Sequence, residues 1–191
     1  MSQLTLNLDS VIQLDRKRFY QICQDNPDLK LERTAEGNLI IMPPTGGETG
    51  RKNANLISQV HRWNEETQLG EVFDSSTGFS LPNGSDRSPD VAWLEKSRWE
   101  ALSPQQRETF LPLCPDFVIE LLSPTDNLKK TQAKLQEYME NGCQLGWLIN
   151  PKPKTVEIYR PQTETEILTA PSSLSGENVL LGFTLDLMKI W

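Results

Sequence analysis

A short, almost entirely apolar segment in the second half of the chain constrains the fold most. Phe117-Val118-Ile119-Glu120-Leu121-Leu122 lies between Pro115 and Pro124. A continuous apolar run of this length, bounded by prolines, is typical of a strand at the centre of a sheet that is covered on both faces. The segment therefore predicts a central strand in a core with helices.

The residues after this strand predict a second strand parallel to it. A helix is expected over about 126–141, capped by Thr125 or Asp126 and ended by Gly142. Leu145-Gly146-Trp147-Leu148-Ile149 then predicts another central strand. Strand, helix and strand over 117–149 form a βαβ unit, which is normally parallel and right-handed. The fold class is thus α/β with a mixed sheet.

The other segments surround this unit. Asp15 is expected to cap a short helix, and two apolar runs around Gly37 predict a β-hairpin over 29–42. Apolar residues at helical spacing predict a long helix over 49–67. Strands follow near residues 72, 79 and 90, a short helix after Pro104, and a strand over 156–159. The tail from Pro161 is expected to pack as short strands.

The length of the chain, 191 residues, predicts one domain over 1–191. Its core is expected over about 49–160, with an N-terminal helix and hairpin in 1–45 and a C-terminal extension in 161–191. No apolar run reaches the ~18 residues of a membrane-spanning helix, so no membrane partner is expected. Residues 1–15 lack the pattern of a secretory signal, which favours the cytoplasm.

The charge and the cysteines exclude two classes of protein. The formal net charge is −7, so the chain has no strongly basic coat for nucleic acid, and any such contact depends on local basic patches or metal ions. The three cysteines are too few and too scattered for a disulfide framework or a Cys-based zinc site.

Two carboxylates stand out by their position. Glu120 lies inside the most apolar strand, where a lone carboxylate costs several kcal/mol unless it is paired, protonated or bound to a metal. Asp90 lies at the head of another apolar strand, and the two acids could share one Mg²⁺ if these strands are adjacent. Asp116 is excluded as the partner because it lies roughly 13 Å along the same strand. A buried salt bridge and a capping role remain the alternatives.

A cation near these acids has to come from outside the strand. Residue 122 shares a face with Glu120 but is a leucine. Lys134 flanks the buried stripe of the following helix, so its stem can lie over the sheet and bring the ammonium near the carboxylates. Taken alone, Glu32 is an ordinary strand glutamate. His61 is the only histidine, so Ser/His/Asp catalysis and a His-rich metal site are not expected.

At these residues the sequence resembles the Uma-two family, a domain-of-unknown-function family of restriction-endonuclease-like proteins in the PD-(D/E)XK nuclease superfamily. Its cyanobacterial branch looks most similar. The resemblance covers nearly the whole chain. Its markers are Leu31-Glu32-Arg33, Met42-Pro43-Pro44-Thr45-Gly46, Ser75-Ser76-Thr77-Gly78-Phe79, Ser88-Pro89-Asp90, Cys114-Pro115-Asp116-Phe117-Val118-Ile119-Glu120, Ser123-Pro124, Lys134 with Tyr138, Gly146-Trp147-Leu148-Ile149 and Leu181-Gly182-Phe183.

The resemblance implies a restriction-endonuclease-like core of order α-β-β-β-α-β and a metal-dependent endonuclease acting on nucleic acid, with DNA expected. Asp90 matches the acid of the PD pair, Glu120 the acid of the second half-motif, and Lys134 a lysine moved from the strand to the helix. Glu32 matches an early family glutamate. Asp90, Glu120 and the Leu121 carbonyl would hold one Mg²⁺ or Mn²⁺. Leu122 departs from the strict pattern.

In the nuclease hypothesis, nearby bases are expected to contact phosphates, namely Arg51, Lys52, Arg87, Lys129 and Lys130.

Two alternatives to a nuclease remain open. The chain could instead be a catalytically silent nuclease-fold module that binds a protein or nucleic acid, which the net charge and Leu122 favour. A homodimer with the apolar C-terminal residues at its interface is a further alternative.

Overall fold

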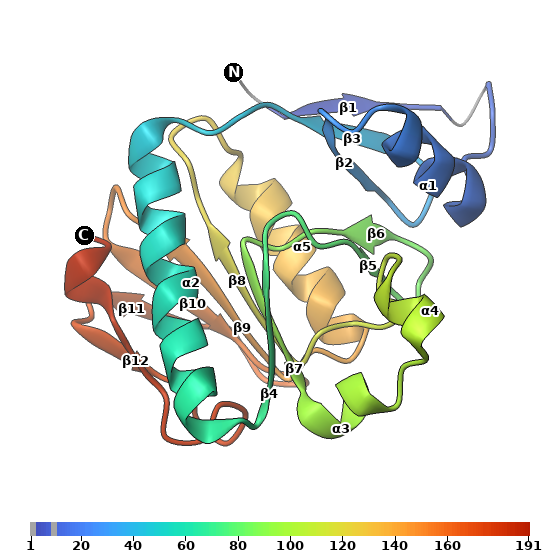
Figure 1. Cartoon of the computed structure of the whole chain (residues 1–191). Coiled ribbons are helices and arrows are strands. Elements are labelled where there is room, and N and C mark those ends of the chain that lie inside the picture. The colour runs from blue at the N-terminus through green and yellow to red at the C-terminus, as the bar shows by residue number, and fades with distance from the viewer. Residues whose placement is uncertain (1–2, 9–10) are drawn as a thin grey trace.

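The structure, a computed structural model, describes residues 3–8 and 11–191. The four remaining residues of the predicted 1–45 segment, 1–2 and 9–10, lie outside the described residues. A six-stranded sheet with strand order β11-β10-β9-β8-β7-β4 forms the centre of the molecule (Figure 1). Its strands are β4 (Gly70–Asp74), β7 (Val91–Glu95), β8 (Phe117–Leu121), β9 (Leu145–Asn150), β10 (Thr155–Tyr159) and β11 (Glu166–Thr169).

The βαβ unit predicted from the apolar segment is confirmed. β8 and β9 pair in parallel, and helix α5 (Leu128–Glu140) connects them. All other pairs in this sheet are antiparallel, so the sheet is mixed. The helix cap differs from the prediction, because the side chain of Asn127, rather than that of Thr125 or Asp126, accepts the hydrogen bond from the Lys130 amide.

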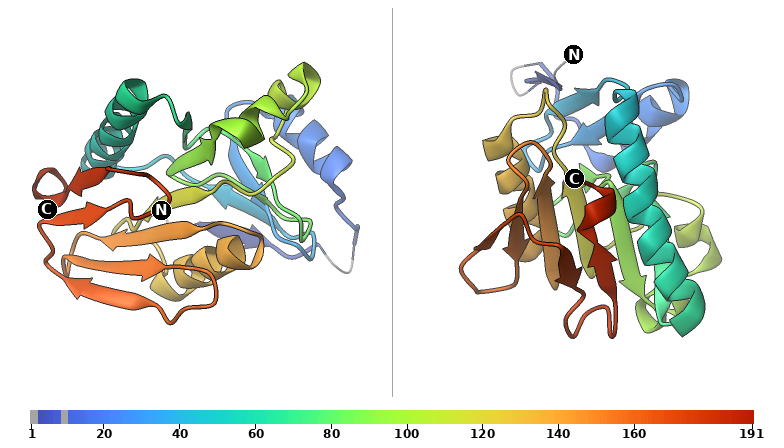
Figure 2. Two further views of the ribbon diagram at one scale, coloured as in Figure 1. Left: turned by 90° about the horizontal axis from the view of Figure 1, so that it is seen from below. Right: turned by 90° about the vertical axis from the view of Figure 1, so that its left-hand side faces the viewer.

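Helices cover the two faces of this sheet, as its apolar central strand requires. Alternate residues of a strand point to opposite faces. Ile119 packs in one core with Leu56 and Trp63 of helix α2 (Gly47–Thr67), whereas Val118 packs with Leu135 of α5. Figure 2 shows α2 and α5 on opposite sides of the sheet. The chain order α2-β4-β7-β8-α5-β9 confirms the predicted α-β-β-β-α-β core.

A second sheet packs beside this core, and it was only partly predicted. Its order is β1-β3-β2-β6-β5, with β1 (Leu4–Leu6), β2 (Lys30–Arg33), β3 (Leu39–Met42), β5 (Phe79–Ser80) and β6 (Asp86–Arg87). The hairpin β2–β3 is confirmed, as is helix α1 (Arg16–Asp25) with its cap Asp15. The pairing of β2 with β6 was not predicted, and it ties the hairpin to the segment that leads into Asp90.

The C-terminal tail packs as predicted, and it does so within the chain. It includes β12 (Ser173–Ser175), β13 (Thr184–Asp186) and the 3₁₀ turn η1 (Leu187–Lys189). Two short helices, α3 (Lys96–Glu100) and α4 (Pro104–Arg107), lie earlier in the chain, between β7 and β8, and α4 begins at Pro104, where a short helix was predicted. Phe183, Leu185 and Leu187 are buried in the core under α2, whereas Leu181 is 58% exposed. The apolar residues that suggested a homodimer interface are thus mostly covered by the chain itself.

Within residues 3–8 and 11–191, no helix has both the length and the apolar character needed to cross a membrane.

Candidate active site

Asp90 and Glu120 meet because β7 and β8 are adjacent. Val91 pairs with Ile119 in the antiparallel register, so one further step places Asp90 opposite Glu120. Opposite residues on neighbouring strands point to the same face, with Cβ atoms about 4.5–5.5 Å apart. Glu120 faces α5, where Lys134 and Tyr138 contact it, whereas Asp90, which directly precedes β7, also contacts Asn53 of α2. The pairing that the sequence left conditional on strand adjacency is therefore present.

Two neighbours fix the orientation of Asp90. Its Oδ2 accepts a hydrogen bond of 2.8 Å from the Leu121 amide, and its Oδ1 accepts one of 3.1 Å from Asn53 Nδ2 on α2. The Leu122 amide donates a hydrogen bond to the Ile149 carbonyl of β9, so the backbone groups of the preceding residue, Leu121, point toward β7. Because the N–H and C=O of one strand residue point to the same edge, the Leu121 carbonyl also faces the Asp90 side.

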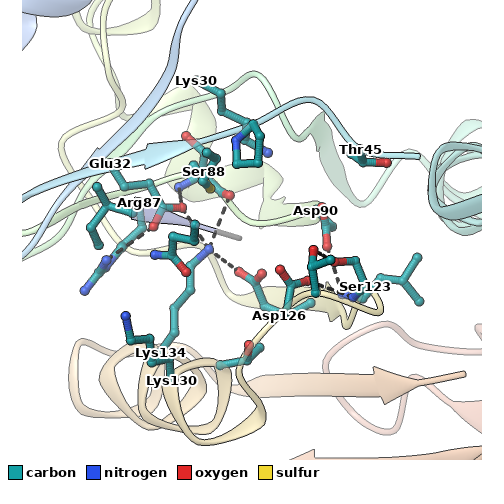
Figure 3. A pocket seen from close by; sticks show the side chains of 18 of the residues that line it. Lys30, Glu32, Thr45, Arg87, Ser88, Asp90, Ser123, Asp126, Lys130 and Lys134 are labelled. Carbon is teal, nitrogen blue, oxygen red and sulfur yellow. Dashed lines mark hydrogen bonds and ion pairs between the residues drawn. The ribbon is translucent and has the colours of Figure 1, made fainter. Parts of the chain in front are cut away.

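Lys134 reaches the acids from α5. Its Nζ lies 2.7 Å from Glu120 Oε1 and 2.8 Å from Glu32 Oε1. The side chain is 14% exposed, so its stem lies along the packed face as its place beside the buried stripe predicted. Figure 3 shows Lys134 reaching toward Glu32, with Asp90 on the other side of the same pocket. All four predicted site residues, Glu32 included, are brought together.

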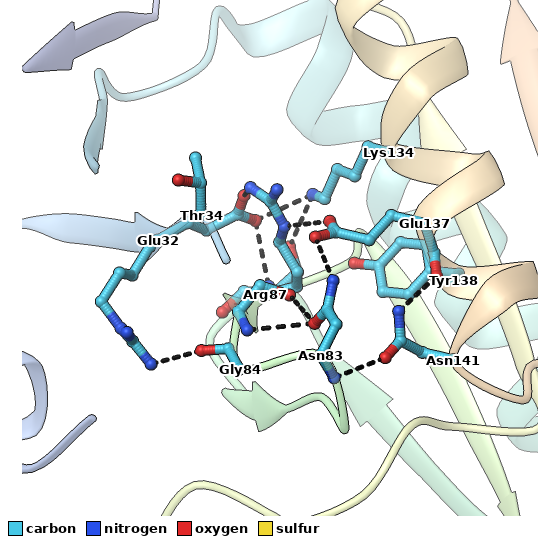
Figure 4. Close-up of polar contacts among 12 residues, drawn as sticks. Glu32, Thr34, Asn83, Gly84, Arg87, Lys134, Glu137, Tyr138 and Asn141 are labelled. Atoms are coloured by element: carbon cyan, nitrogen blue, oxygen red, sulfur yellow. Dashed lines mark hydrogen bonds and ion pairs between the residues drawn. The ribbon is translucent and has the colours of Figure 1, made fainter. Parts of the chain in front are cut away.

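Glu32 enters the site through the second sheet. Arg33 pairs with Asp86, so the next step of this antiparallel register places Glu32 opposite Arg87. Glu32 Oε2 lies 3.2 Å from Arg87 Nη1, and Glu32 Oε1 accepts a hydrogen bond of 3.0 Å from the Ser88 amide (Figure 4). With Lys134 also on Oε1, both oxygens of Glu32 are occupied by donors of the chain.

The electrostatics separate the acids. Burial raises the pKa of Glu120 to about 7, and the charges of Asp90 and Glu32 add to this although Lys134 opposes it. Burial also raises the pKa of Asp90, against the lowering effect of Lys30 and the Leu121 amide. For Glu32, burial is outweighed by Lys134 and Arg87, which lower its pKa to about 2. Despite burial, Glu120 and Glu32 hold the pKa of Lys134 above its usual range.

These side chains lie in a cavity of about 930 Å³ between the second sheet and the core. Eight acidic and only four basic side chains line it, the bases being Lys30, Arg87, Lys130 and Lys134. Of the bases expected to contact phosphates, Lys130 faces this cavity, whereas Arg51 pairs with Glu48. Arg87 is buried between Glu32 and Glu137, so the expectation that it contacts phosphate is not supported.

The donors of the site suit a hard divalent cation. Among the described residues no three His, Cys, Asp or Glu side chains converge to hold a metal, so an ion would need Asp90 and Glu120 with main-chain oxygen and water. Mg²⁺ commonly binds through one or two carboxylates and keeps several waters. Glu32, Asp90, Glu120 and Glu137 with Lys134 and Arg87 carry a net −2 when all are ionised. A divalent cation would balance that charge.

Sequence reasoning missed two neighbours of the acids. Asn53 is one polar residue on a long helix, and no local pattern marks it as the partner of Asp90. Tyr138 was named as a marker of the family resemblance but not as a site residue, yet its hydroxyl donates a hydrogen bond of 3.3 Å to Glu120 Oε1. A buried tyrosine hydroxyl usually has a partner, so this contact had a signal that could have been used.

Comparisons with known proteins identify the family and the fold. The family model Uma2, described as "Putative restriction endonuclease", matches residues 16–188. A solved structure of a putative nuclease belonging to DUF820 from Anabaena variabilis superposes with a TM-score of 0.71 and 24% identity, covering 84% of this chain and 88% of that one. That likeness shows the shared fold. No curated protein matches the chain. Since the family model covers most of its length, the chain belongs to the Uma2 family.

Proposed function

We propose that the chain is a metal-dependent endonuclease that hydrolyses phosphodiester bonds of nucleic acid, with DNA as the first substrate to test. The observation that carries the proposal is the placement of Asp90 opposite Glu120, with the Lys134 ammonium on Glu120. Two acids and a cation at the end of adjacent strands match the chemistry of metal-assisted phosphodiester hydrolysis.

Asp90, Glu120 and the Leu121 carbonyl are the residues that would hold Mg²⁺ or Mn²⁺. Such an ion supplies Lewis-acid polarisation of a phosphoryl oxygen and a lower pKa for a coordinated water. The chain contributes the rest. Asn53 and the Leu121 amide hold Asp90 in place, and Lys134 is positioned to orient the attacking water or to stabilise the charge that develops on the phosphoryl group.

A catalytically silent binding module is the second candidate. The excess of acidic side chains in the cavity favours it, because a polyanion is repelled there unless a cation is present. Leu122, in the position of the strict motif's lysine, favours it too. Turnover separates the two candidates.

The test is a panel of single- and double-stranded DNA and RNA, incubated with Mg²⁺, Mn²⁺ or EDTA. Wild type should cleave at least one substrate in the presence of metal, and Asp90→Asn and Glu120→Gln should not. Glu157→Gln is the matched control, because Glu157 is a buried glutamate of β10 that binds Gln132 and Tyr159 outside the cavity. Cleavage by Glu120→Gln at the wild-type rate would point to a contaminating nuclease.

A further inference from the structure

Arg87 is a buried residue to which the proposed function assigns no role. It belongs to β6 of the second sheet and is 9% exposed. Its Nη1 lies 3.2 Å from Glu32 Oε2, and its Nε lies 2.6 Å from Glu137 Oε2 on α5. The guanidinium therefore bridges the hairpin and the helix that carries Lys134, and its charge is taken up by these two carboxylates (Figure 4).

Glu32 depends on this bridge for its orientation. Arg87 holds Oε2, while the Ser88 amide and Lys134 hold Oε1. Burying a carboxylate without partners is costly, so the three donors together keep Glu32 ionised and in one orientation. Glu32 is already neutralised by two cationic side chains, Arg87 and Lys134, whereas the donors to Asp90 are neutral, so Glu32 is the acid less suited to bind a metal. Its remaining task is to hold Lys134.

The second contact of Lys134 becomes important if a metal binds Glu120. A cation on Glu120 competes with the ammonium that lies 2.7 Å from it. Lys134 would then keep Glu32 at 2.8 Å and the Ser88 carbonyl at 3.5 Å. Glu32 thus holds the lysine beside the acids both with and without a metal bound to Glu120.

We propose that Arg87, supported by Glu137, is a positioning residue that fixes Glu32 as the anchor of Lys134. The inference rests on the proposed function for its catalytic meaning. Arg87 acts through Lys134 and does not touch the substrate. Substitution of Arg87 should therefore lower kcat and leave KM for nucleic acid nearly unchanged.

The experiment compares Arg87→Met with Arg33→Met. Arg33 is the neighbour of Glu32 on β2 and is also buried, but its Nη2 lies 2.7 Å from Asp86 Oδ2, and neither residue lines the cavity. Arg87→Met should lower kcat about 10-fold or more, with KM changed less than 2-fold, and Arg33→Met should leave both near wild type. In the Lys134→Met background, Arg87→Met should add little further loss, because residues that act as a unit are not additive.

Two results would overturn the proposal. The first is a rise in KM for Arg87→Met, together with a slope of log affinity against log salt concentration that is smaller by about one than in wild type. That result would mean that Arg87 contacts a phosphate. Equal stability losses in Arg87→Met and Arg33→Met with wild-type kcat in both would mean a purely structural role. Should Arg87→Met not fold, Arg87→Lys keeps the charge but cannot span both carboxylates. It should lower kcat in the same direction, and wild-type kcat there would contradict the proposal.

A readout without turnover separates this inference from the proposed function. The side-chain ammonium of Lys134, held by two carboxylates, should give a slowly exchanging ¹⁵N NMR signal in wild type and in Arg33→Met. It should broaden or vanish in Arg87→Met. If wild type cleaves no substrate, the endonuclease proposal fails while this signal still decides the positioning role. A signal unchanged in Arg87→Met would overturn that role.

Discussion

The fold shifts the pKa values of Glu120 and Glu32 in opposite directions. The pKa of Glu120, about 7, lies above the ordinary 4.5, so the folded chain binds this proton more tightly than the unfolded chain. The contribution of Glu120 to stability is complete below pH 4.5 and is lost as the pH rises through 7. Glu32, with a pKa near 2, contributes stability above pH 4.5 that is lost as the pH falls toward 2.

Glu120→Gln should therefore flatten the stability profile between pH 4.5 and 7. Across this window the wild-type, metal-free protein should lose on the order of 3 kcal/mol through Glu120. Urea unfolding in EDTA at pH 4.5, 5.5 and 7.0 measures the slope. An identical slope in wild type and Glu120→Gln, with a large loss of stability in the variant, would identify Glu120 as half of a structural ion pair.

Lys134→Met should lower activity by ~10²-fold or more, the scale for the loss of one electrostatic contact in the transition state. It also leaves Glu32 without its lysine, so a loss of about 3 kcal/mol in stability is expected. Activity is therefore compared at a temperature where circular dichroism shows the variant folded. Leu122→Lys added to Lys134→Met returns a cation to the face of Glu120 and should restore part of the activity. Normal turnover by Lys134→Met alone would remove Lys134 from the mechanism.

The residues of the site were predictable to different degrees. Glu120 and Asp90 were found because a carboxylate in or beside an apolar strand is conspicuous in one dimension. Lys134 was found from its place beside the buried stripe. The role of Arg87 could not be found, because its two acids lie 55 and 50 residues away in the chain. Only the pairing of β2 with β6 brings the first of them close.

At the scale of elements, β4 and β7 approach each other closely where β4 begins. A Cβ built on Gly70 would lie 2.2 Å from the Leu94 carbonyl oxygen and 2.6 Å from the Trp93 ring. Gly70→Ala should cost about 1–3 kcal/mol, because backbone has to move. Urea unfolding measures the loss.

Gly50→Ala is the matched control for this substitution. Gly50 lies within α2, and a Cβ there meets nothing within 4 Å. This variant should gain about 0.5–1 kcal/mol, since alanine favours helix over glycine. Equal effects of the two alanines would contradict the close packing described for Gly70.

The elements with strong periodicity were predicted well. The α-β-β-β-α-β core, the hairpin and helix α1 each extend over enough residues to show a period of two or 3.6. Strand β6 has two residues, Asp86 and Arg87, and β1 has three, and such lengths carry no recognisable period. Apart from its hairpin, the second sheet was missed for this reason, although it forms one wall of the cavity.

For the whole molecule, metal binding should be linked to both folding and protons. An ion at 100 times its Kd that binds only the folded state adds about 2.7 kcal/mol of stability. Because carboxylate ligands must be ionised and the pKa of Glu120 is about 7, Mn²⁺ binding should release a proton at pH 6 and none at pH 9. Calorimetry in two buffers of different ionisation enthalpy measures this release.

Asp90→Asn and Glu120→Gln should lose both the binding and the thermal stabilisation, while Glu157→Gln should keep them. Equal Mn²⁺ binding by all four proteins would place the ion elsewhere and remove Asp90 and Glu120 as its ligands.

The second sheet joins parts of the site that are synthesised far apart in time. Glu32, Arg87 and Asp90 leave the ribosome before Glu120, and Lys134 comes last. A domain generally folds as a unit, and this one cannot complete its central sheet while the growing chain still lacks β8 and α5. A growing chain cannot assemble the two acids with their cation, so any cleaving activity begins only once translation has passed α5.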